Sequence, residues 1–420
     1  MTVDRSIAPK PQIIETFNFL EPEVFTLNNG VAVYALRGGE QEIIKTDLVF
    51  DSGSLLASKP LIALTANDLL FTTANGKTSE QIANQFDDYG AFNSKTSTYT
   101  DSVITNYSLS KHLPKVYTLL AETIEKAEFT KNELDTYKFV KIQHLKVSKE
   151  KTSFLARRAF ASALFPNHPY GIISEEEDYK NLTTEALESF YQSHKKLKYI
   201  VVSGAYTAQT IQELNRAFGN FEKSAKIIPS YSLSGSNNKK THIPKADATQ
   251  STVRMGFKTI NRTHADYPKL GILVTLLGGF FGSRLMKNIR EDKGYTYGIH
   301  AGIVSYPDCG LFYVQTDVRK EVYQNTINEI FVEINRLKNE AISDDELDIL
   351  SNYSLGSFLR SIDGAFAVSE KYKTLLDFGQ DYNYYHNYIR LLKNINKEEL
   401  MEIANKYFVE DNIYEVVAGV

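Results

Sequence analysis

The sequence has little cysteine and no long apolar run. Its 420 residues contain one cysteine, Cys309, so neither an internal disulfide nor a cysteine-rich metal site can form. The longest apolar run, residues 270–282, has 13 residues and four glycines, whereas a membrane-spanning helix needs about 20 apolar residues. We therefore expect no membrane span, and we expect this run to lie in a core.

The sequence also lacks an excess of positive charge. The net charge is -4 and the isoelectric point is about 6.1. The chain as a whole has no positive charge to attract nucleic acid, so we do not expect nucleic acid as a partner. Residues 1–15 contain prolines and charges but no apolar signal region, which predicts a cytoplasmic protein. A periplasmic protein whose leader had been removed would show the same N-terminal sequence features.

Common hydrolase motifs are missing as well. The eight histidines are scattered, and no two lie three to five residues apart, so no helical turn presents two imidazoles on one face. There is no Gly-x-Ser-x-Gly motif and no phosphate-binding P-loop. No local motif therefore indicates a metal or catalytic site, although a site assembled from distant histidines remains geometrically possible.

The length and an apolar content of 42% indicate sizeable cores and at least two domains. A stretch rich in Ser, Asn, Gly and Lys (SYSLSGSNNKK) interrupts the chain near its middle and is typical of a surface linker. We predict an N-terminal domain at residues 1–222, with an extended lead-in at 1–22. A linker at 223–245 and a C-terminal domain at 246–420 should follow.

The two halves repeat an order of elements. A helix predicted at 79–88 runs into Gly90 and two strands, and a helix predicted at 283–292 runs into Gly294 and two strands. Strands and helices are grouped and do not strictly alternate. This predicts an α+β fold with two homologous halves, each a mainly antiparallel sheet packed with helices.

Four segments, spread over nearly the whole chain, resemble the peptidase M16 family (insulinase or pitrilysin family). The segments are 25–34 (FTLNNGVAVY), 156–171 (ARRAFASALFPNHPYG), 201–221 (VVSGAYTAQTIQELNRAFGNF) and 279–302 (GFFGSRLMKNIREDKGYTYGIHAG). They occur in the family's order. The resemblance implies the same two-half α+β fold and a zinc-peptidase ancestry.

Active members carry an inverted zinc motif, His-x-x-Glu-His, on a first-half helix, which we predict here at 61–72. Leu64 stands at the first histidine, Asn67 at the general-base glutamate and Asp68 at the second histidine. The third ligand, a more distant glutamate, would fall near Gln143 or His144. The resemblance thus implies that the zinc site is degenerate, and that this chain holds no metal and no catalytic residue of its own.

The family's substrate-binding pair is retained. It is an arginine and a tyrosine seven positions apart, which match Arg290 and Tyr297. We expect Arg290 in the last turn of a helix, a break at Gly294, and Tyr297 on the following strand. Both side chains donate hydrogen bonds, which suits peptide carbonyl oxygens and the oxyanion of hydrolysis.

These features predict a non-catalytic, substrate-binding subunit of a heterodimeric zinc metallopeptidase. The resemblance implies a zinc-bearing partner subunit, with the zinc and general base in that partner, and unfolded or short peptides as substrates. A homodimer in the absence of that partner is also expected. The alternative is a peptidase-derived scaffold or homodimeric peptide-binding protein without a proteolytic role. An independent metallopeptidase with unusual ligands is a third reading.

Overall fold

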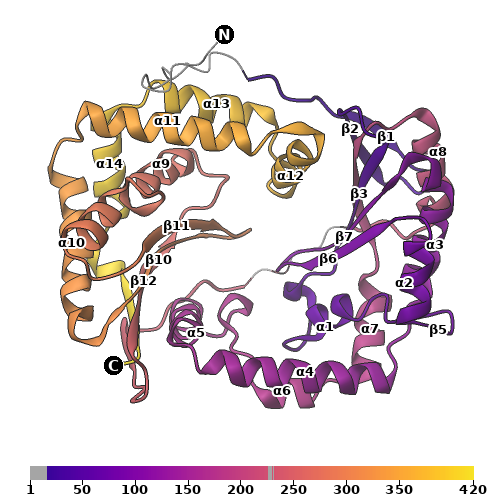
Figure 1. The fold of residues 1–420 in the computed structure, drawn as a ribbon, viewed down its shortest axis with the longest axis horizontal. Helices are drawn as coiled ribbons and strands as arrows, with labels where there is room; N and C mark the ends of the chain where they lie inside the picture. Colours follow the sequence, from indigo (N-terminus) through magenta and orange to yellow (C-terminus); the bar gives the residue numbers. More distant parts are fainter. Residues whose placement is uncertain (1–16, 226–228, 230) are drawn as a thin grey trace, which may run out of the picture.

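A computed structural model describes residues 17–225, 229 and 231–420 of the chain. Two sheets, each covered by helices, make up the two halves of the molecule (Figure 1). Most strand pairs are antiparallel. The predicted α+β fold with two helix-packed halves is confirmed.

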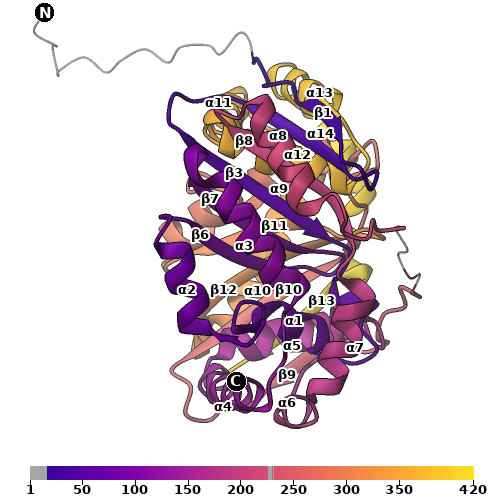
Figure 2. The same cartoon turned by 90° about the vertical axis from the view of Figure 1, so that its right-hand side faces the viewer.

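The first sheet has six strands in the order β1-β2-β8-β3-β7-β6. Only β2 and β8 run parallel to each other. Helices α2, α3 and α8 lie over its outer face (Figure 2). The strands are β1 (Glu23–Thr26), β2 (Ala32–Arg37), β3 (Ile43–Phe50), β6 (Phe92–Ser97), β7 (Ser102–Leu109) and β8 (Leu197–Gly204).

The second sheet has five strands in the order β11-β12-β10-β13-β9. These strands correspond, in this order, to β6, β7, β3, β8 and β2 of the first sheet. Its one parallel pair, β9 with β13, corresponds to β2 with β8. This shared topology confirms the internal repeat that the order of elements predicted. The strands are β9 (Lys240–Ile243), β10 (Gln250–Thr259), β11 (Ile299–Ser305), β12 (Gly310–Arg319) and β13 (Tyr414–Ala418).

Helices pack against both sheets. Those of the first half are α1 (Ile62–Asp68), α2 (Ser79–Asp87), α3 (Leu113–Glu125), α4 (Lys131–Lys149), α5 (Thr152–Leu164), α6 (Glu176–Lys180), α7 (Thr184–His194) and α8 (Ala208–Phe218). Those of the second half are α9 (Tyr267–Gly278), α10 (Tyr323–Asn339), α11 (Asp344–Arg360), α12 (Gly364–Asp377), α13 (Tyr382–Lys393) and α14 (Lys397–Tyr407).

Local sequence signals fix several element boundaries. Gly30 adopts a φ of 82° in the turn between β1 and β2, a left-handed conformation that glycine enters without steric cost. The Thr78 side chain caps α2 in a reciprocal pair with Gln81. The helix predicted at 61–72 is shorter than expected, because it ends at Asp68.

The predicted domain boundaries stay a prediction. Part of the expected lead-in, residues 1–16, and part of the expected linker, residues 226–228 and 230, lie outside the described residues. The described end of that linker contains β9. Among the described residues, no helix combines the length and apolarity that crossing a bilayer requires.

The two halves exchange a helix. Helix α5 of the first half packs on β10 and β13 of the second sheet, and α12 of the second half packs on β8 and β2 of the first (Figure 1). Phe160 and Leu164 of α5 are buried in a cluster with Leu311 and Val416 of the second sheet. Burial of this apolar surface requires both halves, so each half stabilises the other.

An ion network with a buried centre joins α12 to the first sheet. Lys45 and Asp47 of β3 are almost fully buried and lie 2.8 Å apart, Nζ to Oδ2. Lys373 and Glu370 of α12 complete the network, with Lys373 Nζ 3.0 Å from Asp47 and 2.9 Å from Glu370. Burial alone would raise the pKa of Asp47, but Lys45 and Lys373 outweigh burial and lower it.

We expect Asp47→Asn to lower the free energy of unfolding by about 3 kcal/mol, because it removes a buried counterion from two lysines. Folding lowers the pKa of Asp47, so the ionised carboxylate stabilises the folded chain. This stabilisation is fully present above the ordinary carboxyl pKa of about 4. It is lost as the pH falls through the lower pKa of the folded state. Urea unfolding of both proteins between neutral and acidic pH measures this difference.

The matched control is Asp135→Asn, which breaks the exposed pair between Lys131 and Asp135. This change should leave the unfolding midpoint where it is, since exposed pairs contribute little. Equal destabilisation by the two substitutions would contradict the role given to the buried network.

Candidate functional site

Arg290 lies on a short π-helical segment, η4 (Met286–Asp292), which replaces most of the α-helix predicted there. Its guanidinium carbon lies 4.5 Å from the centre of the Phe281 ring, a cation–π distance. Among the described residues, no carboxylate lies within ion-pair distance of Arg290. The guanidinium is therefore positioned by an aromatic face, and its hydrogen-bond donors remain available.

Tyr297 lies in the loop that joins η4 to β11. Gly294 ends the helical segment with a φ of 64°, as predicted. Tyr297 itself precedes β11 by two residues, so the prediction that it lies on the strand was wrong. Thr296 anchors this loop, because its hydroxyl donates to the Asp317 carbonyl oxygen at 2.8 Å. The loop thus holds the Tyr297 backbone against β12.

The Tyr297 side chain projects into solvent. It is 96% exposed, and within the described part of the chain its hydroxyl has no hydrogen-bond partner. Phe281 is also 62% exposed. Large aromatic side chains with this exposure do not stabilise their own fold, so they suit a contact with another molecule.

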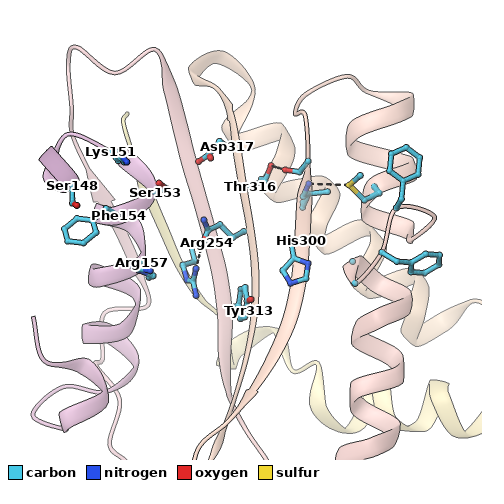
Figure 3. Close-up of a pocket in the computed structure, with 18 residues that line it drawn as sticks. Ser148, Lys151, Ser153, Phe154, Arg157, Arg254, His300, Tyr313, Thr316 and Asp317 are labelled. Atoms are coloured by element: carbon cyan, nitrogen blue, oxygen red, sulfur yellow. Dashed lines mark hydrogen bonds between the residues drawn. The ribbon is translucent and has the colours of Figure 1, made fainter. Parts of the chain in front are cut away.

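A cavity of ≈ 890 Å³ adjoins Arg290 and Tyr297, because Phe281 and Gly298 both line it. Its other walls are the start of α5 and the strands β10, β12 and β11 (Figure 3). The first and second halves of the chain thus both contribute to it. Its polar and charged residues are Ser148, Lys151, Ser153, Arg157, Arg254, His300, Gln315, Thr316 and Asp317.

Burial shifts the ionisation of two side chains in this cavity. It lowers the pKa of His300, which favours the neutral imidazole near neutral pH. Burial, together with the charge of Arg157, also lowers the pKa of Arg254, although a guanidinium stays protonated at any physiological pH. Among the described residues, no carboxylate forms an ion pair with His300.

The three positions that the resemblance assigns to the zinc motif lie on α1. Leu64 is 37% exposed and has no donor atom for a metal. Asn67 is 4% exposed, and neither atom of its amide has a hydrogen-bond partner in the described part of the chain. Asp68 is the one residue of the three with a carboxylate.

Asp68 is bound by side chains from α4. Its Oδ2 accepts hydrogen bonds from Lys141 Nζ and Tyr137 OH, each at 2.9 Å. Gln143 and His144, the expected neighbourhood of the third ligand, are exposed. In the described ranges, no group of three or more His, Cys, Asp or Glu side chains could hold a metal ion. These residues do not fit a zinc ion.

A second lysine lies beside the same helix. Lys95 of β6 donates to the carbonyl oxygens of Asp68 and Leu70 at the end of α1. Burial lowers the pKa of Lys95 to about 8. Two ammonium groups thus bind the residues at the end of α1. The sequence reasoning missed both lysines and the Phe281 platform, because none of them belongs to a motif.

We expect the purified chain to retain no stoichiometric zinc after incubation with zinc chloride and gel filtration, because Lys141 neutralises Asp68 and Leu64 offers no ligand. Inductively coupled plasma mass spectrometry measures the metal content. One zinc ion per chain that disappears in Asp68→Ala would contradict this expectation.

Comparisons with known proteins agree with this geometry. Residues 181–352 match the family described as "Peptidase M16 inactive domain". The chain is 24% identical over 351 residues to the "Uncharacterized zinc protease YmxG" of Bacillus subtilis, covering 82% of this chain and 84% of that protein. It is 24% identical over 246 residues to the "Probable inactive metalloprotease YmfF" of the same organism, covering 57% of each.

A solved structure shares the fold. It is the crystal structure of a peptidase M16 inactive domain from Pseudomonas fluorescens, which has a TM-score of 0.85 and 22% identity and covers 95% of this chain and 98% of that one. The family match, the curated relatives and the motif segments agree with one another. The chain is thus similar to peptidase M16 proteins, and residues 181–352 match the inactive domain of that family.

Proposed function

We propose that this chain is the non-catalytic, substrate-binding subunit of a heterodimeric zinc metallopeptidase that cleaves unfolded or short peptides. The observation that carries the proposal is the exposed Tyr297 beside a cavity at whose rim Arg290 is held on Phe281. The contacts of α1 also support it, since Lys141 binds Asp68 at a position where an active relative would need a metal ligand. The zinc and general base then come from the partner subunit.

The donor chemistry of the pair suits a peptide backbone. A guanidinium and a phenol both donate hydrogen bonds, and peptide carbonyl oxygens accept them. The same donors stabilise the negative charge that develops on a carbonyl oxygen during hydrolysis. Zinc in the partner would supply the activated water. Arg290 and Tyr297 would orient the peptide and stabilise the oxyanion.

An extended peptide has a sheet edge available near this pair. Strand β11 is the edge of the second sheet, and it begins two residues after Tyr297. A peptide that adds a strand to an edge gains main-chain hydrogen bonds regardless of its sequence. This mode suits unfolded substrates, because a folded protein does not expose a free strand of backbone.

A scaffold role is the alternative. An exposed tyrosine without an intramolecular contact gives a scaffold no stability, so the exposure of Tyr297 favours the binding role. A homodimer in the absence of the partner is compatible with either function.

The partner can be found by affinity purification of this chain from its own cell, which we expect to recover a zinc-bearing M16 subunit. Adding this chain to that subunit should raise the rate of peptide cleavage. Arg290→Ala and Tyr297→Phe should each reduce kcat of the mixture about a hundredfold, the usual effect of losing one oxyanion donor. A quenched fluorescent peptide measures the rate.

Lys287→Ala is the matched control, since Lys287 is an exposed cation on the same helical segment and does not line the cavity. It should leave the rate unchanged. The proposal fails if the partner alone cleaves as fast as the mixture, or if the Arg290 and Tyr297 variants behave like the control.

A further inference from the structure

Two arginines from different halves of the molecule point into the cavity. Arg157 comes from α5 and Arg254 from β10, and α5 packs against β10 (Figure 3). Two guanidinium groups repel each other, and bringing them together in a partly buried site costs free energy. Such a pair is stabilised when an anion binds between its members.

Arg254 has hydrogen-bond donors to spare. One of its terminal nitrogens donates to the side-chain oxygen of Gln315. The guanidinium lies between two rings, 5.2 Å from the centre of Phe160 and 4.5 Å from that of Tyr313. Its Nε is buried without a partner among the described residues. The rings fix the plane of the guanidinium but accept none of its in-plane hydrogen bonds.

Arg157 differs from its neighbour Arg158. Arg158 donates to the Ser174 carbonyl oxygen at 2.7 Å and to Glu175 at 2.8 Å, which ties α5 to the following loop. Arg157 is exposed and lines the cavity. Within the described part of the chain no carboxylate pairs with it. Arg157 is therefore available to a ligand, whereas Arg158 has a structural role.

The charges that line the cavity are unbalanced. Lys151, Arg157 and Arg254 are cations, and Asp317 is the one carboxylate among the lining residues. Asp317 already accepts a hydrogen bond from the Thr252 hydroxyl. His300 adds no negative charge. The cavity has three cations against one anion and favours a ligand that brings a carboxylate.

We propose that Arg157 and Arg254 form a subsite for a carboxylate of the bound peptide, either an acidic side chain or the free C-terminus. The inference rests on the proposed function, because Arg290 and Tyr297 at the cavity rim are what hold the peptide there. A planar guanidinium binds a planar carboxylate through two parallel hydrogen bonds. Two arginines at one site give selectivity against basic residues as well as affinity for acidic ones.

The subsite depends on the helix exchange. Arg157 reaches the second sheet because α5 leaves its own half to cover β10 and β13. A separated second half would keep Arg254 but lose its neighbour. Recognition of an acidic peptide therefore requires the assembled chain.

The test is binding of short unstructured peptides to the full-length chain, measured by fluorescence anisotropy. The set shares one sequence: an amidated neutral peptide, an amidated peptide with one Glu, an amidated peptide with one Lys, and the neutral peptide with a free C-terminus. We expect the Glu peptide or the free-carboxylate peptide to bind at least about tenfold more tightly than the amidated neutral peptide, as for other charge-assisted hydrogen bonds. Which of the two gains affinity identifies the source of the carboxylate.

Arg157→Gln should abolish most of this preference while neutral-peptide binding persists, and Arg254→Met should act in the same way. Arg157 is exposed, so its variant should fold normally even if the Arg254 variant does not. Arg158→Gln is the matched control on the same helix and should keep the preference. Equal binding of all four peptides, or an unchanged preference in Arg157→Gln, overturns the subsite alone. Failure of every peptide to bind overturns the proposed function and the subsite with it.

Discussion

The exchange of α5 and α12 between the two sheets is the constraint on which the rest of the structure depends. Each helix packs on the sheet of the other half. At one of these contacts the buried pair Lys45 and Asp47 is joined by Lys373 and by the exposed Glu370. A buried network is stable when each charge has a counterion at short distance. The relative placement of the halves follows, and with it the cavity that both halves line.

At the positions that the resemblance assigns to a zinc motif, lysine contacts take the place of metal ligands. A zinc ion bridges elements by attracting anionic or neutral donors, and an ammonium group can replace its charge but not its coordination. Lys141 links α4 to α1 through Asp68, and Lys95 binds the carbonyl oxygens at the end of α1. These contacts join α1 to α4 and to β6 without a metal ion.

Much of the fold could be predicted because it rests on local signals. Hydrophobic periodicity, the Asn-Gly turn at Gly30 and the cap at Thr78 act within a few residues, and the order of elements revealed the repeat. The position of Tyr297 was wrong by two residues, since the start of β11 depends on pairing with β12. Strand ends set by long-range pairing are not encoded next to the residue concerned.

The sequence by itself determined the fold class, the resemblance to the peptidase M16 family and the absence of His, Glu and His from helix α1. These properties depend on residue identity and spacing along the chain. Only the tertiary structure decided that Lys141 binds Asp68, that Phe281 holds Arg290, and that Arg157 faces the same cavity as Arg254. Each of these contacts joins elements that are brought together by packing, and packing is a property of the whole folded chain.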